Sequence, residues 1–116
     1  MERFADAAFA AVANGRALVG DLRSVRIEWQ SRIKARRGAS AWQLADLLLR
    51  QPVVNVRVVA QDLGVAPQNV YRVVDPLLEA GVLVTSGARR DRIWWAPEVL
   101  AAVDAFAARA GRRAGP

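Results

Sequence analysis

Apolar residues recur every three or four positions through most of the chain, which is the spacing of one face of an α-helix. In the first third, this pattern predicts a short helix over 2–13 and a longer one over 16–37, with Asn14-Gly15 as a stop signal between them. The longer helix has a single apolar stripe, and arginines occupy its other faces. The stripe consists of Leu18, Leu22, Val25, Trp29 and Ile33.

Three further helices are predicted in close succession, over 40–50, 55–63 and 67–80. They are followed by two short apolar runs, 82–84 and 93–95, which alternate as β-strands do and have a polar turn between them. Three helices closed by a hairpin are the layout of a winged helix-turn-helix, a fold that commonly binds nucleic acid. We therefore predict a mainly α fold of this kind.

Several residues mark the boundaries of these elements. Ser40 followed by Gln43 predicts a capping box at the first of the three helices. Asn55 is a suitable N-cap for the second helix, and Gly64 is suited to the left-handed conformation after it. Pro76 lies inside the third helix, where we expect a kink or an early end because proline removes a backbone hydrogen bond.

The chain accordingly divides into three parts. Residues 1–38 form an N-terminal helical appendage of two helices, 39–96 form the winged helix-turn-helix with its β-hairpin wing, and 97–116 form a C-terminal helix and a basic tail. At 116 residues, this is the size of one domain with an appendage.

The composition argues against an enzyme. The chain has no histidine and no cysteine, which excludes disulfides, thiolate metal sites and the commonest metal ligand and general base. Its carboxylates are scattered, and it has no glycine-rich phosphate loop. We expect no catalytic residues, no metal and no cofactor. No apolar run is long enough to span a membrane, so a cytoplasmic location is expected.

The net charge of +6 is unevenly distributed. Residues 1–38 hold eight basic and four acidic side chains, a net of +4, whereas 39–96 hold six and five, a net of +1. Of the basic residues, only Lys34 is a lysine, and the arginine fork suits phosphate and guanine. The predicted DNA-binding part is therefore nearly neutral, which weakens its non-specific affinity for DNA.

The residues expected to contact DNA lie first on the N-terminal face of the 67–80 helix, the part that such proteins insert into the major groove. They are Gln68, Asn69, Tyr71 and Arg72. Amides suit adenine, arginine suits guanine, and a tyrosine hydroxyl suits phosphate. The alternative is an ordinary solvated helix face, and Asp75 and Glu79 further along would repel phosphate.

The predicted wing supplies a second group of candidates. Arg89, Arg90 and Arg92 crowd the turn and the start of its return strand, and wing arginines commonly contact the backbone or the minor groove. The alternative is a solvated turn with scattered charge. Trp94 and Trp95 are adjacent in a strand and so point to opposite faces. We expect one in the core and the other packed outward, against a neighbouring helix or another chain.

The stripe of Leu18, Leu22, Val25, Trp29 and Ile33 must be covered. It can fold onto the chain's own core or form a contact with a partner. Because a small winged helix has limited surface to cover two helices, we expect a homodimer through residues 1–38. Such a dimer would present two recognition helices to double-stranded DNA.

Several runs resemble a known family. Leu47 to Val54, Leu63 to Ala66, Val70 to Leu77 and Ala80 to Leu83, continued by 90–94, 96–100 and 104–106, resemble the C-terminal winged-helix region of Fic/DOC family proteins. The family's HPFxDGNGR catalytic motif is absent, so no catalytic residue is carried over. The resemblance implies either a DNA-binding domain or a protein-interaction and dimerisation appendage that regulates a Fic-type adenylyltransferase without binding DNA. A Fic catalytic domain is then a possible partner.

Overall fold

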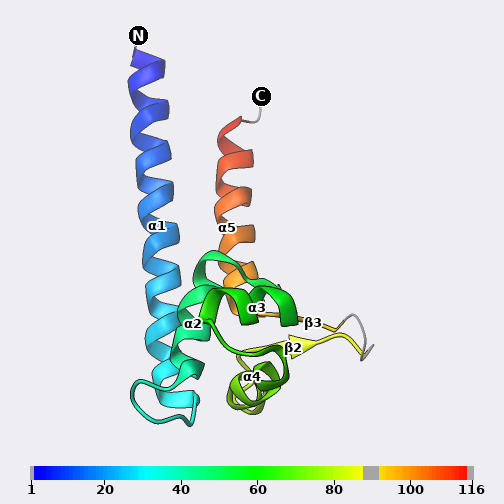
Figure 1. Cartoon of the computed structure of the whole chain (residues 1–116). Coiled ribbons are helices and arrows are strands. Elements are labelled where there is room, and N and C mark those ends of the chain that lie inside the picture. The colour runs from blue at the N-terminus through cyan, green and yellow to red at the C-terminus, as the bar shows by residue number, and fades with distance from the viewer. Residues whose placement is uncertain (1, 88–91, 115–116) are drawn as a thin grey trace.

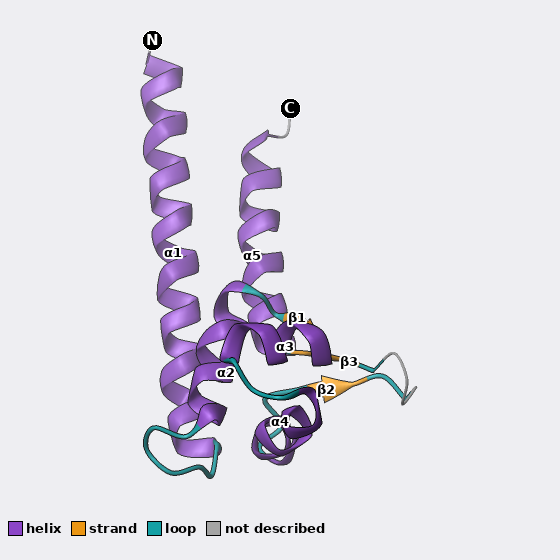
Figure 2. Ribbon diagram, viewed as in Figure 1, coloured by secondary structure: helices purple, strands orange, loops and turns teal. Residues whose placement is uncertain are grey.

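The structure of the protein is a computed structural model that describes residues 2–87 and 92–114 (Figure 1). The chain is mainly helical, with one small antiparallel sheet (Figure 2). Its elements in order are α1 Glu2–Arg32, α2 Ser40–Arg50, β1 Val53–Asn55, α3 Val56–Leu63, the 3₁₀ turn η1 Pro67–Asn69, α4 Val70–Glu79, β2 Val84–Thr85, β3 Ile93–Trp95 and α5 Pro97–Ala114.

The N-terminal part is one uninterrupted helix, α1, and the prediction of two helices separated at Asn14-Gly15 was wrong. Asn14 is buried, and its amide group donates a 3.1 Å hydrogen bond to the Phe106 carbonyl of α5. Its carbonyl oxygen accepts a hydrogen bond from Nε of Arg109. Asn14 therefore uses its polar atoms to join two helices. Further along, α1 ends at Arg32 rather than near residue 37.

The first and last helices form an arm. In Figure 1, α1 and α5 run side by side, and both termini lie at the end of the arm far from the sheet. The Cα radius of gyration is 17.0 Å, against about 13 Å for a compact chain of this length. The molecule is thus a small globular body with a helical arm, by which we mean α1 together with α5. Among the described residues, no helix is long and apolar enough to cross a membrane.

The globular body contains α2, α3, α4 and the sheet. Asn55 caps α3 as predicted, because its side chain accepts a 2.9 Å hydrogen bond from the Val58 amide. Gly64 ends α3 in the left-handed conformation, at φ 67°. The predicted capping box at Ser40 does not form. Ser40 is already the first helical residue, and the N-cap of α2 is Ala39, which has no side-chain oxygen.

The third helix of the body begins later than expected. Pro67–Asn69 form a 3₁₀ turn, and α4 starts at Val70. Pro76 does not end α4, which continues to Glu79, and the Pro76 carbonyl accepts a hydrogen bond from the Ala80 amide. Gly81 then reverses the chain at φ 72°, a conformation that glycine adopts without steric cost.

The sheet has three strands in the order β1-β3-β2, all antiparallel. The hairpin predicted from two strands does form, but its first strand is Val84–Thr85 rather than 82–84. Val82 and Leu83 are instead buried ahead of it. A third strand, β1, pairs with β3, and Val54 lies opposite Trp94.

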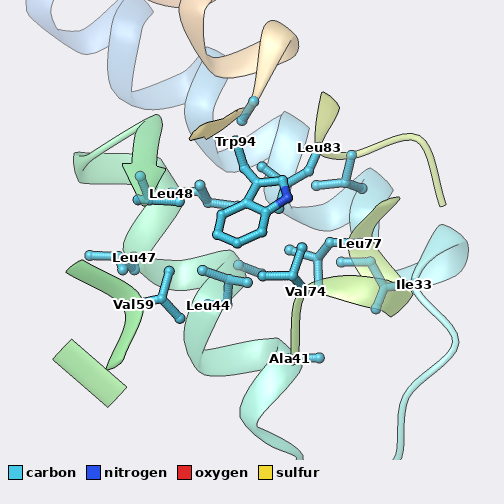
Figure 3. Close-up of a cluster of buried hydrophobic side chains, with 14 of the residues drawn as sticks. Ile33, Ala41, Leu44, Leu47, Leu48, Val59, Val74, Leu77, Leu83 and Trp94 are labelled. Atoms are coloured by element: carbon cyan, nitrogen blue, oxygen red, sulfur yellow. The ribbon is translucent and has the colours of Figure 1, made fainter. Parts of the chain in front are cut away.

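The core surrounds Trp94, which is fully buried among side chains from the body (Figure 3). Its immediate surroundings include Leu44, Leu48 and Val74. Ile93 is 39% exposed, because successive residues of a strand point to opposite faces and Trp94 points inward. Leu63 and Leu100 lie at the edge of the core and are half-buried.

Candidate nucleic-acid interface

The polar face predicted to contact DNA is exposed at the start of α4. Gln68, Asn69 and Arg72 are all exposed, whereas Val70 and Val74 on the opposite face are fully buried. This arrangement follows from helical periodicity, because positions four apart share a face. The same surface carries the exposed carboxylates Asp75 and Glu79 further along the helix, so its N-terminal end is the part free of negative charge.

Tyr71 connects this helix to the sheet. Its ring meets the Trp94 ring edge-on, with centroids 5.6 Å apart and planes at 77°. Tyr71 remains 38% exposed, and within the described part of the chain its hydroxyl has no hydrogen-bond partner. A buried tryptophan therefore fixes the ring direction of Tyr71, while its hydroxyl is free to contact a ligand. Edge-on aromatic pairs of this kind stabilise by about 0.5–1.5 kcal/mol beyond their burial.

An open pocket of about 690 Å³ lies beside the start of the α4 segment. It is bounded by the first turns of α3, by Pro67 of η1 and by the beginning of β3. Arg92 lines it, together with Ile93. Arg92 is half-buried, and its Nε is shielded from solvent without a hydrogen-bond partner among the described residues. Because a guanidinium group forms strong hydrogen bonds with phosphate and carboxylate oxygens, the presence of Arg92 in its lining suits this pocket to an anionic group.

The same pocket contains an arginine that was not predicted as a site residue. Arg57 is the second residue of α3, is exposed, and lines the pocket together with Arg92. The N-terminal turn of a helix also carries partial positive charge, which favours an anion there. The sequence signal that could have identified Arg57 is its place two residues after the strong N-cap Asn55.

The other two wing candidates, Arg89 and Arg90, lie outside the described residues. The wing is therefore represented here by Arg92 alone. On the described side of the turn, Thr85 Oγ1 donates a 3.0 Å hydrogen bond to the Ile93 carbonyl, which holds β2 against β3 close to Arg92.

Some of the other described arginines form ion pairs with carboxylates. Arg26 pairs with Asp46 at 2.7 Å and lies over the Trp42 ring, and Arg50 contacts Asp62 at 3.4 Å. By contrast, Arg57, Arg72 and Arg92 have no ion-pair partner within residues 2–87 and 92–114. Cations without a carboxylate partner remain available to phosphate.

The residues predicted for a dimer interface lie mostly against the chain itself. Trp29 is fully buried and Ile33 is 4% exposed, both in the core of the body. Leu22 and Val25 are partly buried against that core, and Leu18 is half-buried. The sequence left two alternatives for this stripe, packing on the chain's own core or contact with a partner. Trp29 and Ile33 pack in the chain's own core, so they are not available to a second copy in this conformation.

The comparisons with known proteins assign the chain to no family. No family model matches the chain, and no curated protein matches it. In the described part of the chain, no three His, Cys, Asp or Glu side chains are grouped so that they could hold a metal ion. The arrangement of Arg57, Arg72, Arg92 and the neighbouring amides therefore carries the functional argument.

Proposed function

We propose that the chain is a DNA-binding winged-helix module of transcription-regulator type, acting on double-stranded DNA in the cytoplasm. The observation that carries this proposal is the pocket in which Arg57 of α3 and Arg92 of the wing meet beside Pro67, where the α4 segment begins. Two arginines that have no carboxylate partner among the described residues thus flank the start of the α4 segment, where Gln68 and Asn69 of η1 are exposed.

The order of the elements supports the proposal. Helix α2 is followed by β1, by the pair α3 and α4, and then by the β2–β3 hairpin. Strand β1 pairs with β3, which closes the sheet against the three helices. This is the arrangement expected of a winged helix, in which α4 is the recognition helix and the β2–β3 turn is the wing.

Each contact then has a chemical role. Gln68 and Asn69 are suited to adenine edges, and Arg72 is suited to guanine, since each can form two hydrogen bonds to its base in the major groove. Arg57, Arg92 and the Tyr71 hydroxyl are suited to phosphate oxygens, which set the position of the helix without specifying sequence.

The carboxylates limit the binding mode. Asp75 and Glu79 share the exposed surface of α4 with Arg72, so only the N-terminal half of the helix can approach the phosphates closely. With few phosphate contacts from each copy, we expect modest affinity that falls steeply as salt is added.

Fluorescence anisotropy with a labelled random-sequence duplex at low salt tests the proposal. The wild type should bind, and Arg57→Ala/Arg72→Ala/Arg92→Ala should bind at least about tenfold more weakly, a difference of about 1.4 kcal/mol. Arg16→Ala/Arg23→Ala/Arg36→Ala is the matched control, because it removes the same charge from exposed positions elsewhere. Equal loss in both variants, or no binding by the wild type, contradicts the proposal.

A second candidate is a protein-interaction appendage that regulates a Fic-type adenylyltransferase without binding DNA. The observation that favours it is the helical arm, which extends beyond α2, α3, α4 and the sheet (Figure 1). Under this alternative, the arm would bind a Fic catalytic domain or a second copy of the chain, and the duplex would leave the anisotropy unchanged.

A further inference from the structure

The outer side of α1 carries an apolar line that nothing in the described structure covers. Phe9 is 76% exposed, Val12 and Val19 are each 53% exposed, and Ile27 is 59% exposed. With the exposed Arg16 and Arg23, they follow one another at intervals of three or four residues and so share one face of the helix. We call Phe9, Val12, Arg16, Val19, Arg23 and Ile27 the outer stripe.

The outer stripe lies on the side of α1 opposite the residues that hold the fold together. Asn14, Trp29 and Ile33 are buried, and Asn14 contacts α5 directly. Positions such as Val12 and Val19 are about half a helical turn away from Asn14. The predicted docking stripe of residues 18–33 and the outer stripe are therefore different faces.

Isolated exposed apolar side chains are common on protein surfaces, but an aligned series is not. From Phe9 to Ile27, the outer stripe covers about 27 Å along the helix. Ala8, Ala13 and Gly20 border it and are exposed, so the backbone of another helix can approach closely. A straight apolar line with small residues beside it is the shape that a second helix fits.

We propose that the outer stripe binds an amphipathic, acidic helix of another polypeptide. Arg16 and Arg23 are the only charged residues of the stripe, and neither has an ion-pair partner among the described residues. The described carboxylates Asp21 and Glu28 of α1 instead approach Arg109 and Arg32, at 4.0 Å and 3.5 Å. A partner that brings apolar residues and carboxylates in the same 3-4 spacing satisfies both parts of the stripe.

A second copy of the same chain fits this face less well. In a two-fold pair of outer stripes, Arg16 and Arg23 of one copy would face the same arginines of the other, and like charges at an interface repel. The exposed carboxylate nearest the face of the stripe, Asp6, precedes Phe9 by one turn and lies about 15 Å along the helix from Arg16 of the same copy.

An anionic membrane surface also fits less well. Helices that lie on membranes carry their arginines at the edges of the apolar face, where the side chains reach the head groups. Arg16 and Arg23 instead lie within the apolar line, between Val12 and Val19 and between Val19 and Ile27. A helix with carboxylates can form ion pairs with these guanidinium groups, whereas the acyl chains of a membrane cannot.

The outer stripe is on α1, which contributes no residue to the lining of the pocket of Arg57 and Arg92. The inference therefore does not rest on DNA binding, and either can fail alone. Its test uses two synthetic helical peptides with leucines in 3-4 spacing. One has glutamates at the positions that would face Arg16 and Arg23, and its twin has lysines there. Binding of each labelled peptide to the full chain is followed by anisotropy.

We expect the glutamate peptide to bind at least about tenfold more tightly than the lysine peptide. Val12→Asp/Val19→Asp should abolish this binding, and Arg16→Glu/Arg23→Glu should reverse the preference in favour of the lysine peptide. Arg36→Glu/Arg37→Glu, which changes the same charge at exposed positions beyond α1, is the control and should keep the wild-type preference.

Four results overturn the inference. The first two are that the glutamate peptide does not bind and that both peptides bind equally. The third is that the wild type self-associates in sedimentation and Val12→Asp/Val19→Asp removes this association. The fourth is that the wild type binds anionic phosphatidylserine vesicles and the same variant removes this binding. The altered residues are exposed, so circular dichroism of each variant should match that of the wild type.

Discussion

The Arg32 guanidinium, at the last residue of α1, forms a 2.8 Å ion pair with Glu98 in the first turn of α5. The same guanidinium donates two hydrogen bonds to the Ala80 carbonyl just after α4, at 3.0 Å from Nη2 and 3.3 Å from Nε. A Cβ added at Gly81 would lie 3.5 Å from Nη2. One arginine thus joins both helices of the arm to the end of the helix that carries the candidate interface.

We predict that Arg32→Ala lowers the free energy of unfolding by about 1–3 kcal/mol, the usual range when a hydrogen bond to a charged group is lost and an acceptor is left unpaired. Arg32→Lys should recover only part of this, because an ammonium cannot bond Ala80 and Glu98 with the same fork. Urea denaturation measures both. A lysine variant as stable as the wild type would show that only the charge matters.

The burial of the core predicts that two truncations of apolar side chains lower the free energy of unfolding by different amounts. Leu48→Ala removes a fully buried side chain beside Trp94 and should cost about 2–5 kcal/mol. Ile93→Ala, one position before Trp94 in β3, should cost much less because Ile93 is 39% exposed. Thermal or urea unfolding compares them. Equal losses would indicate that β3 faces the core with its other side.

Asn14 should be required for the arm rather than for helix termination. Asn14→Ala removes the bond to the Phe106 carbonyl and leaves Arg109 without that acceptor, so we expect about 1–3 kcal/mol of destabilisation. Helical content by circular dichroism should not rise, as it would if Asn14 interrupted α1. Hydrogen exchange of the amides in α5 should accelerate. Unchanged exchange there contradicts this role for Asn14.

The salt dependence of DNA binding should distinguish the arginines that contact phosphate from the one that contacts a base. Each phosphate contact that is lost should reduce the slope of log K against log salt by about 1. We therefore expect a smaller slope for Arg57→Ala and for Arg92→Ala. Arg72→Ala should change the slope less and should weaken the preference among duplex sequences, because Arg72 is assigned to a base. Identical slopes for all three variants contradict these assignments.

The parts of the fold that depend on local signals could be predicted from the sequence. Asn55 and Gly64 mark the ends of α3 where expected, because a cap and a left-handed glycine act within a few residues of themselves. The hairpin was also predicted, although β2 begins at Val84 rather than Val82.

The parts that depend on tertiary contacts could not be predicted. Asn14 has the local character of a helix stop, and only α5, more than 90 residues later, provides the partners that keep it inside a helix. Trp29 was expected at a dimer interface, because the spacing of apolar residues does not say which surface they pack against. In the structure, this part of α1 packs in the core of the body. Arg57 became a candidate only when α3 and β3 were seen to share a pocket.

Amide chemical-shift mapping of the full chain with a short duplex tests the central claim most directly, because it locates the bound DNA on the protein. We predict that the largest shifts occur in three segments, namely 55–57, 67–72 and 92–93, and that they diminish as salt is added. The outer stripe of α1 should remain unchanged. Shifts confined to the arm, or no shifts at low salt, would contradict the assignment of the α3–α4–wing face to DNA.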